Sequence, residues 1–395
     1  MIELSIVIPI YNEEDGVLPV LDELETFRQQ FADRYKAEQR EVEIVLVDDG
    51  STDQTASLLE RNPFPKRIIT QPNQGYGAAL KTGFRVARGR WVGFLDADGT
   101  YPVDAFFSMY EDAKSNGIDL MIGSRLDQPS GMPGVRNLGN RSFAALLGVT
   151  SGSTVTDIAS GMRLLRRERV PDVAMLPDGL DFTPAMTTWA LHDEWTIKEI
   201  PIAYRERIGD SKLNVVRDGL RFTYDILSIS SLYNPLKLFG VAGVALLLAG
   251  LALTMGPLLH YAQVREVPDT SIYRLLTALV LWVIGLQSVV CGIVGTSFAR
   301  LLHRKSLRAT GIERSLLSPG VTGRLHWGAA LLIGGAFVLN AQGVSEYLTN
   351  GTVSEHWSRL LAGVVLVLTA VHLVLYQILV AYLGALERRF VNRPI

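Results

Sequence analysis

The stretch Trp91-Val92-Gly93-Phe94-Leu95-Asp96-Ala97-Asp98 decides the fold of the N-terminal half of this chain. Five apolar residues run into two carboxylates one residue apart, and the turn-forming stretch Gly-Thr-Tyr-Pro follows at 99–102. In 395 residues roughly one Asp-x-Asp arises by chance, so the context gives this motif its meaning. At the carboxyl end of a strand, two such carboxylates can bind a divalent metal on the ligand-binding edge of a sheet.

The composition indicates two parts. With 48% hydrophobic residues and a mean hydropathy of +0.20, the chain is too apolar for an ordinary soluble enzyme. Its 20% of charged residues are too many for a purely membrane-embedded protein. The formal net charge of -2 disfavours nucleic acid as a partner, because nucleic-acid binding needs a basic surface. The one cysteine, Cys291, excludes an internal disulfide and any multi-cysteine metal cluster.

The C-terminal part holds four apolar stretches that exceed the roughly 20 residues needed to cross a bilayer. They cover about 236–259, 275–299, 325–347 and 360–386. We therefore expect an all-α membrane domain of four transmembrane helices over 235–395. Before it, residues 213–234 set Val216 and Leu220 against Arg217 and Arg221, which predicts an amphipathic juxtamembrane helix. A plain linker helix packed on the N-terminal domain stays open as an alternative for this segment.

Basic residues predict the orientation in the membrane. The connection between the second and third spans carries Arg300, Arg304, Lys305, Arg308, Arg314 and Arg324, so it is expected in the cytoplasm. Two spans precede this connection, so the N-terminal domain before them is expected in the cytoplasm as well. Met1-Ile2-Glu3 lacks a basic start, and we expect no signal peptide. The expected location is a bacterial or archaeal plasma membrane, or the endoplasmic reticulum in a eukaryote.

Residues 1–212 alternate between strand-like and helical patterns. The predicted strands are 4–8, 42–47, 67–70, 91–95 and 120–123, and the helical patterns include 13–35, 75–88 and 102–116. This alternation predicts an α/β domain with a mostly parallel sheet. Polar clusters follow three of the strands, at 9–13, 48–53 and 96–98. Because ligands bind beyond the carboxyl ends of parallel strands, we expect these clusters to share one site.

Four motifs carry a family resemblance. They are Ile8-Pro9-Ile10-Tyr11-Asn12-Glu13, Val47-Asp48-Asp49-Gly50-Ser51-Thr52-Asp53, Asn73-Gln74-Gly75-Tyr76-Gly77-Ala78-Ala79-Leu80-Lys81 and Asp96-Ala97-Asp98. In this order they resemble glycosyltransferase family 2, which implies a nucleotide-sugar-binding GT-A fold. Further motifs at 123–125, 136–141, 161–163 and 207–213 are similar to the dolichyl-phosphate mannose synthase branch, which transfers a sugar to a polyprenyl phosphate. The resemblance covers about residues 3–232.

The resemblance implies a site for a UDP- or GDP-linked sugar. Pro9 and Tyr11 would enclose the base, while Asp48 and Asp49 would accept hydrogen bonds from the base and the ribose. The implied nucleotide-binding residues are Pro9, Tyr11, Glu13, Asp48, Asp49, Lys81, Asp96 and Ala97. For Ser51 and Thr52 we favour a simpler role as caps of the next helix. The glycines at 75 and 77 would permit close backbone approach at a helix start.

The implied metal is Mg²⁺ or Mn²⁺. Asp98 would be a direct ligand, Asp96 would bridge to ribose or metal-bound water, and diphosphate oxygens would complete the coordination. Thr100 occupies a position where a related residue can assist, but a hydroxyl is a weak ligand.

Several basic residues predict an acceptor phosphate. They exceed what a metal-neutralised diphosphate needs, and arginine suits bidentate phosphate binding. The expected set is Arg125, Arg136, Asn140, Arg163, Arg207 and Lys212, for an undecaprenyl or dolichyl type of phosphate. By resemblance Arg136 and Arg207 act in catalysis together with Asp96 and Asp98. For Arg125 and Arg163 a solvated surface role stays open.

Three functions are compatible with these residues. The leading function is sugar transfer by direct displacement: an oxygen of the lipid phosphate attacks the anomeric carbon of the sugar and inverts its configuration. This attack needs no base, because a phosphate monoester with a second pKa of about 6 is already largely anionic at neutral pH. The second is transfer to a lipid or polysaccharide hydroxyl, with Asp157 as base; we prefer Asp157 as the ion-pair partner of Arg163 or another arginine. No Gln-x-x-Arg-Trp motif of processive synthases occurs.

The third function is a non-enzymatic lipid-translocating or scaffolding protein. The shortage of ionisable residues within the spans argues against a transport path. Membrane lipids are expected partners in every case, and the small residues Gly334-Gly335-Ala336 make a homo-oligomer conceivable.

Overall fold

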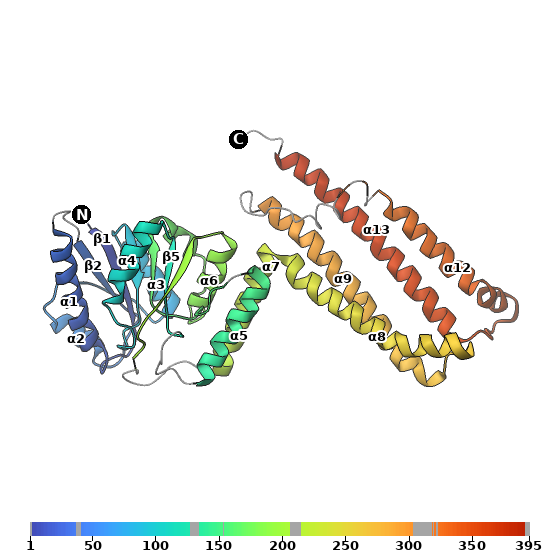
Figure 1. Cartoon of the computed structure of the whole chain (residues 1–395), viewed down its shortest axis with the longest axis horizontal. Coiled ribbons are helices and arrows are strands. Elements are labelled where there is room, and N and C mark those ends of the chain that lie inside the picture. The colour runs from blue at the N-terminus through green and yellow to red at the C-terminus, as the bar shows by residue number, and fades with distance from the viewer. Residues whose placement is uncertain are drawn as a thin grey trace. The chain divides into compact units, whose positions relative to one another are not determined.

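The computed structural model describes residues 2–36, 41–126, 134–152, 154–205, 215–302, 318, 320 and 323–391. It divides into two compact units, Met1–Ser230 and Ser231–Ile395 (Figure 1). The helix expected at 213–234 falls almost entirely within the first unit, while the domain boundaries at 212 and 234 stay predictions.

The first unit is built on a seven-stranded sheet with the order β3-β2-β1-β4-β6-β5-β7. Neighbouring strands from β3 to β4 are parallel, as are β5 and β7, whereas β6 runs antiparallel to both β4 and β5. The strands are β1 (Ile2–Ile10), β2 (Glu41–Asp48), β3 (Arg67–Thr70), β4 (Trp91–Phe94), β5 (Leu120–Ser124), β6 (Arg163–Arg166) and β7 (Ile197–Pro201). The mostly parallel α/β fold is therefore confirmed.

Helices cover both faces of this sheet and give it three layers (Figure 1). Helices α1, α2 and α4 pack on one face, and α3 and α6 on the other. Because both faces are covered, β4 is buried along its whole length, which explains its unbroken apolar sequence. The helices are α1 (Val17–Arg34), α2 (Thr55–Arg61), α3 (Tyr76–Val86), α4 (Ala105–Asn116), α5 (Gly134–Ser151), the 3₁₀ helix η2 (Arg167–Val173), α6 (Phe182–His192) and α7 (Val215–Tyr233).

Helices α5 and α7 pack together beside α6. Leu147 and Ile226 are buried there with Ile158, and the rings of Phe143 and Phe222 lie 5.8 Å apart. The opposite side of α7 is apolar but exposed, with Val216 and Leu220 both more than two-thirds accessible. Arg217 and Arg221 of the same helix are exposed as well, and the amphipathic juxtamembrane role of this segment stays a prediction.

The second unit consists of long apolar helices. Four of them, over Leu236–Val264, Asp269–Ala299, Leu325–Asn350 and Trp357–Ala385, are long and apolar enough to cross a membrane, which confirms the four expected spans. The elements are the π-helical turn η3 (Leu236–Gly240), α8 (Val241–Val264), the 3₁₀ turn η4 (Asp269–Ser271), α9 (Ile272–Leu302), α12 (Leu325–Asn350) and α13 (Trp357–Val391). Helix α8 packs on α9, and α12 packs on α13.

Candidate active site

The loops after β1 and β2 are joined by hydrogen bonds at the carboxyl edge of the sheet. The backbone N–H of Thr52 donates to Asn12 Oδ1 at 2.8 Å, and the N–H of Asn12 donates to Ser51 Oγ at 3.0 Å. Asp48, at the end of β2, accepts the N–H of Ser51 at 3.0 Å. The parallel strands thus bring the clusters at 9–13 and 48–53 together, as the sequence predicts.

Asp49 orders the loop that leads into α3. Its carboxylate accepts hydrogen bonds from the side chain of Gln71 at 2.7 Å and from the backbone N–H groups of Gln74 and Gly75 at 3.0 and 2.8 Å. Asp53 likewise accepts the N–H of Thr55 at the start of α2 at 3.0 Å. The nucleotide-binding role of Asp49 stays a prediction, but the structure assigns its carboxylate a clear task in shaping this loop.

The glycines of the Asn73–Gly77 motif are needed by the fold itself. Gly75 has φ +104°, and a Cβ there would lie 2.6 Å from the carbonyl oxygen of Asp178. This carbonyl accepts the N–H of Ala78 at 3.1 Å. The close backbone approach expected at this helix start is therefore made, within the described structure, by the chain's own loop before α6.

Asp96 and Asp98 follow β4 and are held by different partners. Tyr76 donates its hydroxyl to Asp96 Oδ1 at 2.7 Å, and a Cβ at Gly161 would collide with the same carboxylate. Asp98, only 4% exposed, accepts the N–H of Thr100 at 3.1 Å and its hydroxyl at 2.6 Å. Thr100 thus orients Asp98, a role different from the doubtful ligand role that the sequence suggests.

The carboxylates at 96 and 98 fit a divalent cation that is shared with a substrate. The described residues contain no group of three or more His, Cys, Asp or Glu side chains that could hold a metal ion by themselves. Two carboxylates therefore need further oxygen ligands, which the phosphate groups of a substrate would supply. Mg²⁺ and Mn²⁺ are bound in this way, through few carboxylates together with substrate phosphates.

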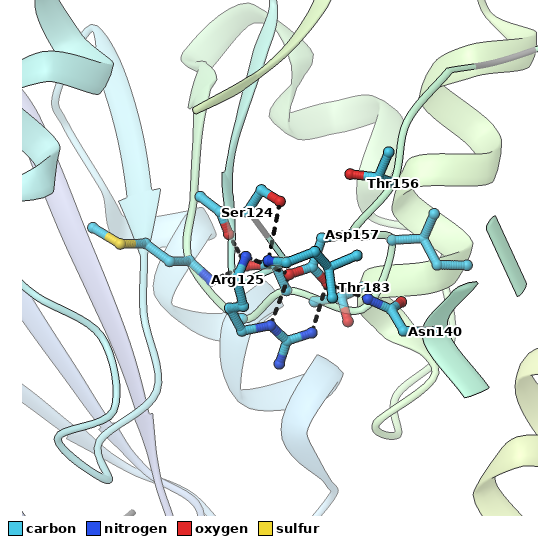
Figure 2. A network of polar contacts seen from close by, with 12 residues as sticks. Ser124, Arg125, Asn140, Thr156, Asp157 and Thr183 are labelled. Atoms are coloured by element: carbon cyan, nitrogen blue, oxygen red, sulfur yellow. Dashed lines mark hydrogen bonds and ion pairs between the residues drawn. The ribbon is translucent and has the colours of Figure 1, made fainter. Parts of the chain in front are cut away.

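A buried ion pair fixes Arg125 at the end of β5 (Figure 2). Asp157 accepts Nε of Arg125 at 2.8 Å, Nη2 at 2.6 Å and the backbone N–H of the same residue at 2.9 Å. Asn140 of α5 donates its side-chain amide to the other side of this carboxylate at 2.8 Å. Glu199 in turn accepts the backbone N–H of Asp157 at 2.8 Å. The guanidinium is held in one direction, as a phosphate-binding group should be.

Asp157 is an ion-pair partner rather than a base. Burial opposes its charge, but Arg125 and the hydrogen bonds from Arg125 and Asn140 outweigh burial and hold the pKa of Asp157 below its usual value. The side chain is completely buried, so no substrate hydroxyl reaches it. The expected ion pair is confirmed, and its partner is Arg125 rather than Arg163.

Arg163 lies inside the fold on β6. Its Nε donates to the carbonyl oxygen of Ser160 at 3.1 Å and its Nη2 to that of Ile158 at 2.6 Å, while Nη1 has no hydrogen-bond partner among the described residues. Burial lowers the pKa of Arg163 to about 10, which still leaves the group charged at neutral pH. With 0% exposure, Arg163 offers no surface to an acceptor in this structure, and its phosphate-binding role stays a prediction.

The structure describes only some of the other predicted site residues. Pro9 pairs with Val47 inside the sheet, and Tyr11 and Glu13 follow β1. Lys81 forms an ion pair with Asp178 at 2.5 Å and donates to the carbonyl oxygen of Leu176 at 2.8 Å. Arg136 lies on α5, but its side chain is outside the described residues, as are Arg207 and Lys212 altogether.

Three tyrosines of the site carry no role in the sequence analysis. Tyr101 is buried and Tyr76 is partly buried, and burial raises the pKa of each well above its usual value. Tyr101 accepts the N–H of Gly161 at 2.7 Å, and its hydroxyl is close enough to feel the charges of Arg125 and Asp96. Tyr204 faces the ring of Tyr101 at 5.3 Å, and the guanidinium of Arg125 lies 5.4 Å from its centroid. These tyrosines place the carboxylates and Arg125 in one site.

The chain matches known proteins in both units. Residues 5–173 match the model of glycosyl transferase family 2, and residues 235–393 match that of a domain of unknown function, DUF8752. A dolichyl-phosphate hexose transferase of Haloferax volcanii is 31% identical over 233 residues, which are 58% of this chain and 93% of that protein.

Two further proteins are similar over large parts of their length. An undecaprenyl-phosphate 4-deoxy-4-formamido-L-arabinose transferase of Pseudomonas fluorescens is 30% identical over 66% of this chain and 73% of its own. The solved structure of glucosyl-3-phosphoglycerate synthase from Mycobacterium tuberculosis, in complex with Mn²⁺, UDP-glucose and glycerol 3-phosphate, has a TM-score of 0.45 and 19% identity over 58% of this chain and 80% of that one.

A mostly parallel sheet with two carboxylates at its carboxyl edge, followed by four apolar helices, defines a membrane-associated enzyme with a GT-A-like domain. The chain belongs to glycosyltransferase family 2 and is a glycosyltransferase. The non-enzymatic alternative is thereby excluded.

Proposed function

We propose that the protein transfers a hexose from a UDP- or GDP-linked sugar to a polyprenyl phosphate at the cytoplasmic face of a membrane, with inversion at the anomeric carbon. The observation that carries the proposal is the fixed guanidinium of Arg125, which lies over the ring of Tyr204. Tyr204 packs on Tyr101, whose hydroxyl accepts the N–H of Gly161, and Gly161 lies directly against Asp96. The carboxylates suit a metal-bound diphosphate, and the arginine suits a second phosphate.

The donor half of the site consists of the loops after β1, β2 and β4. Asp48 and the residues after β1 would bind the nucleoside, and Asp96 and Asp98 would hold Mg²⁺ or Mn²⁺ against the diphosphate. A bound divalent ion supplies positive charge that stabilises the departing nucleoside diphosphate. Thr100 and Tyr76 keep the two carboxylates in place for this purpose.

The arginines of the site and the names of two similar transferases support a polyprenyl phosphate as the acceptor. The two transferases from Haloferax and Pseudomonas are named for dolichyl and undecaprenyl phosphate, respectively. Arg125 would orient the phosphate of such a lipid, together with Arg136, Arg207 and Lys212. The phosphate is anionic at neutral pH, so its oxygen attacks without a base. This agrees with the complete burial of Asp157, which removes the base that a hydroxyl acceptor needs.

The decisive experiment uses purified full-length protein with Mg²⁺, a panel of UDP- and GDP-linked hexoses, and either polyprenyl phosphate or the matching polyprenol. We expect one nucleotide sugar to yield a lipid-linked sugar with the phosphate and none with the alcohol. Removing divalent metal with EDTA should abolish turnover, and added Mg²⁺ or Mn²⁺ should restore it.

Each part of the proposal has its own contradicting result. Product on polyprenol alone would overturn the phosphate acceptor. Undiminished turnover in EDTA would overturn the metal assignment. A product that retains the donor's anomeric configuration, measured by NMR, would overturn direct displacement.

A further inference from the structure

A cleft of about 480 Å³ lies between the loop that precedes α3 and the loop that precedes α6. Gly75 lines it on one side, Asp178, Gly179 and Asp181 line it on the other, and Arg221 of α7 completes it. The residue next to Gly75 is Tyr76, whose hydroxyl donates to Asp96. The cleft is thus linked to Asp96 through the chain neighbour of one of its lining residues, and the acidic residues that line it, Asp178 and Asp181, lie outside the motifs at 9–13, 48–53, 73–81 and 96–98.

Asp181 presents an unused acceptor to this cleft. The residue is only 9% exposed, and its Oδ1 has no hydrogen-bond partner among the described residues. A buried carboxylate oxygen without a donor is costly, because it has given up water without replacing it. Gly179 keeps the space in front of this atom open, since a Cβ there would lie 2.6 Å from Asp181 Oδ1 and 3.8 Å from Arg221 Nη1.

The carboxyl group of Asp225 on α7 interacts with that of Asp181. Burial first, and then the hydrogen bond to Asp181 and its charge, raise the pKa of Asp225 to about 7, while the positive charge of Arg221 acts in the opposite direction. At or below neutral pH Asp225 thus keeps its proton and donates it in this hydrogen bond.

The charges of the cleft select the kind of ligand. A phosphate would meet the carboxylates of Asp178 and Asp181 against the single guanidinium of Arg221, and Lys81 is already paired with Asp178. A metal cation would be repelled by Arg221. A neutral ligand with several hydroxyl groups suits both charges, because carboxylates accept and guanidinium groups donate hydrogen bonds.

We propose that this cleft binds the hexose of the donor, with Asp181 accepting hydrogen bonds from sugar hydroxyls and Arg221 donating to sugar oxygens. The proposal rests on the proposed function, because it takes a nucleotide sugar as the donor, but it does not depend on the acceptor. It makes Asp181 and Arg221 determinants of sugar specificity. It also gives α7 a direct part in substrate binding.

The test compares two probes on the full-length protein in detergent with Mg²⁺, by calorimetry. One probe is the nucleotide sugar that the wild type turns over in the donor panel, and the other is its nucleoside diphosphate. In Asp181→Asn and in Arg221→Gln we expect affinity for the nucleotide sugar to fall about tenfold, the effect of one lost charge-assisted hydrogen bond. Affinity for the nucleoside diphosphate should stay unchanged.

Arg217→Gln is the matched control, because Arg217 is an exposed arginine one turn earlier on α7 and does not line the cleft. It should bind both probes as the wild type does. If Asp181→Asn does not fold, the exposed Arg221 still decides the question. Unchanged affinity for the nucleotide sugar, or an equal loss for both probes, would overturn the sugar site. A wild type that binds no nucleotide sugar would instead overturn the donor in the proposed function, and the sugar site with it.

Discussion

In the proposed reaction Asp157 supports the binding of the acceptor phosphate by orienting Arg125, and the variant Asp157→Asn tests this role. The ion pair has 12% and 0% exposed side chains, so removing one charge leaves the other buried without compensation. We expect the free energy of unfolding to fall by about 3 kcal/mol. The apparent KM for polyprenyl phosphate should rise more than that for the nucleotide sugar, because Arg125 loses its fixed direction.

Asp112→Asn serves as the control for this prediction, because its ion pair with Lys198 at 2.6 Å is partly exposed. Its removal should cost less than about 1 kcal/mol and leave both KM values unchanged. The lowered pKa of Asp157 also sets a pH dependence: its stabilisation is complete above the unfolded pKa of about 3.8 and is lost as the pH falls through the lower folded-state pKa. Equal shifts of both KM values would contradict the role given to Arg125.

Residues of the site could be predicted from sequence only where they directly follow a predicted strand. Asp48, Asp96 and Asp98 meet this condition, since parallel strands end at one edge. The pairing of Arg125 with Asp157, 32 residues away, depends on how β5 and the segment before β6 come together. Asp181 and Arg221 are further apart still, and no local pattern distinguishes them from surface charges.

At the scale of elements, the strands that sequence patterns predict well are those buried on both faces. The runs at 4–8, 42–47 and 91–95 are apolar except for Ser5 and Glu43, because helices cover both sides of β1, β2 and β4. Strand β6, Arg163–Arg166, is four residues long with arginine at each end, and β7 mixes polar and apolar residues. Their pairing with β4 and β5 is long-range, so their sequences alone did not identify them.

Close packing of α8 on α9 depends on glycines that face each other. A Cβ at Gly243 would lie 2.7 Å from the carbonyl oxygen of Gly285, and one at Gly285 would lie 2.9 Å from Leu247. Small residues at such contacts let membrane helices approach closely. Gly243→Ala should therefore lower the stability of the detergent-solubilised protein by about 1–3 kcal/mol, measured by thermal or chemical unfolding.

Gly384→Ala on α13 is the matched substitution, because no described residue lies within 4 Å of a Cβ at that position. It should be neutral or slightly stabilising, since alanine favours a helix by about 1 kcal/mol over glycine. Equal stability of the two variants would show that α8 and α9 do not need this contact.

At the scale of the whole molecule, the proposed reaction requires the GT-A-like domain on the side of the membrane where nucleotide sugars are present. The basic connection after the second span predicts this side to be the cytoplasm, and an even number of spans returns the C-terminus to it. The connection between α12 and α13 should then lie outside. Cys291 is the one cysteine of the chain, so replacing it gives a background for single reporter cysteines.

In the Cys291→Ala background we expect Thr352→Cys, in the exposed turn between α12 and α13, to react with a membrane-impermeant maleimide on intact cells. Glu60→Cys, on the exposed side of α2, should react only after the cells are opened. Both variants should label equally in detergent, which controls for access to each thiol. Labelling of Glu60→Cys from outside would place the catalytic domain opposite to the side we propose, and the transfer reaction would then have to draw its donor from outside the cytoplasm.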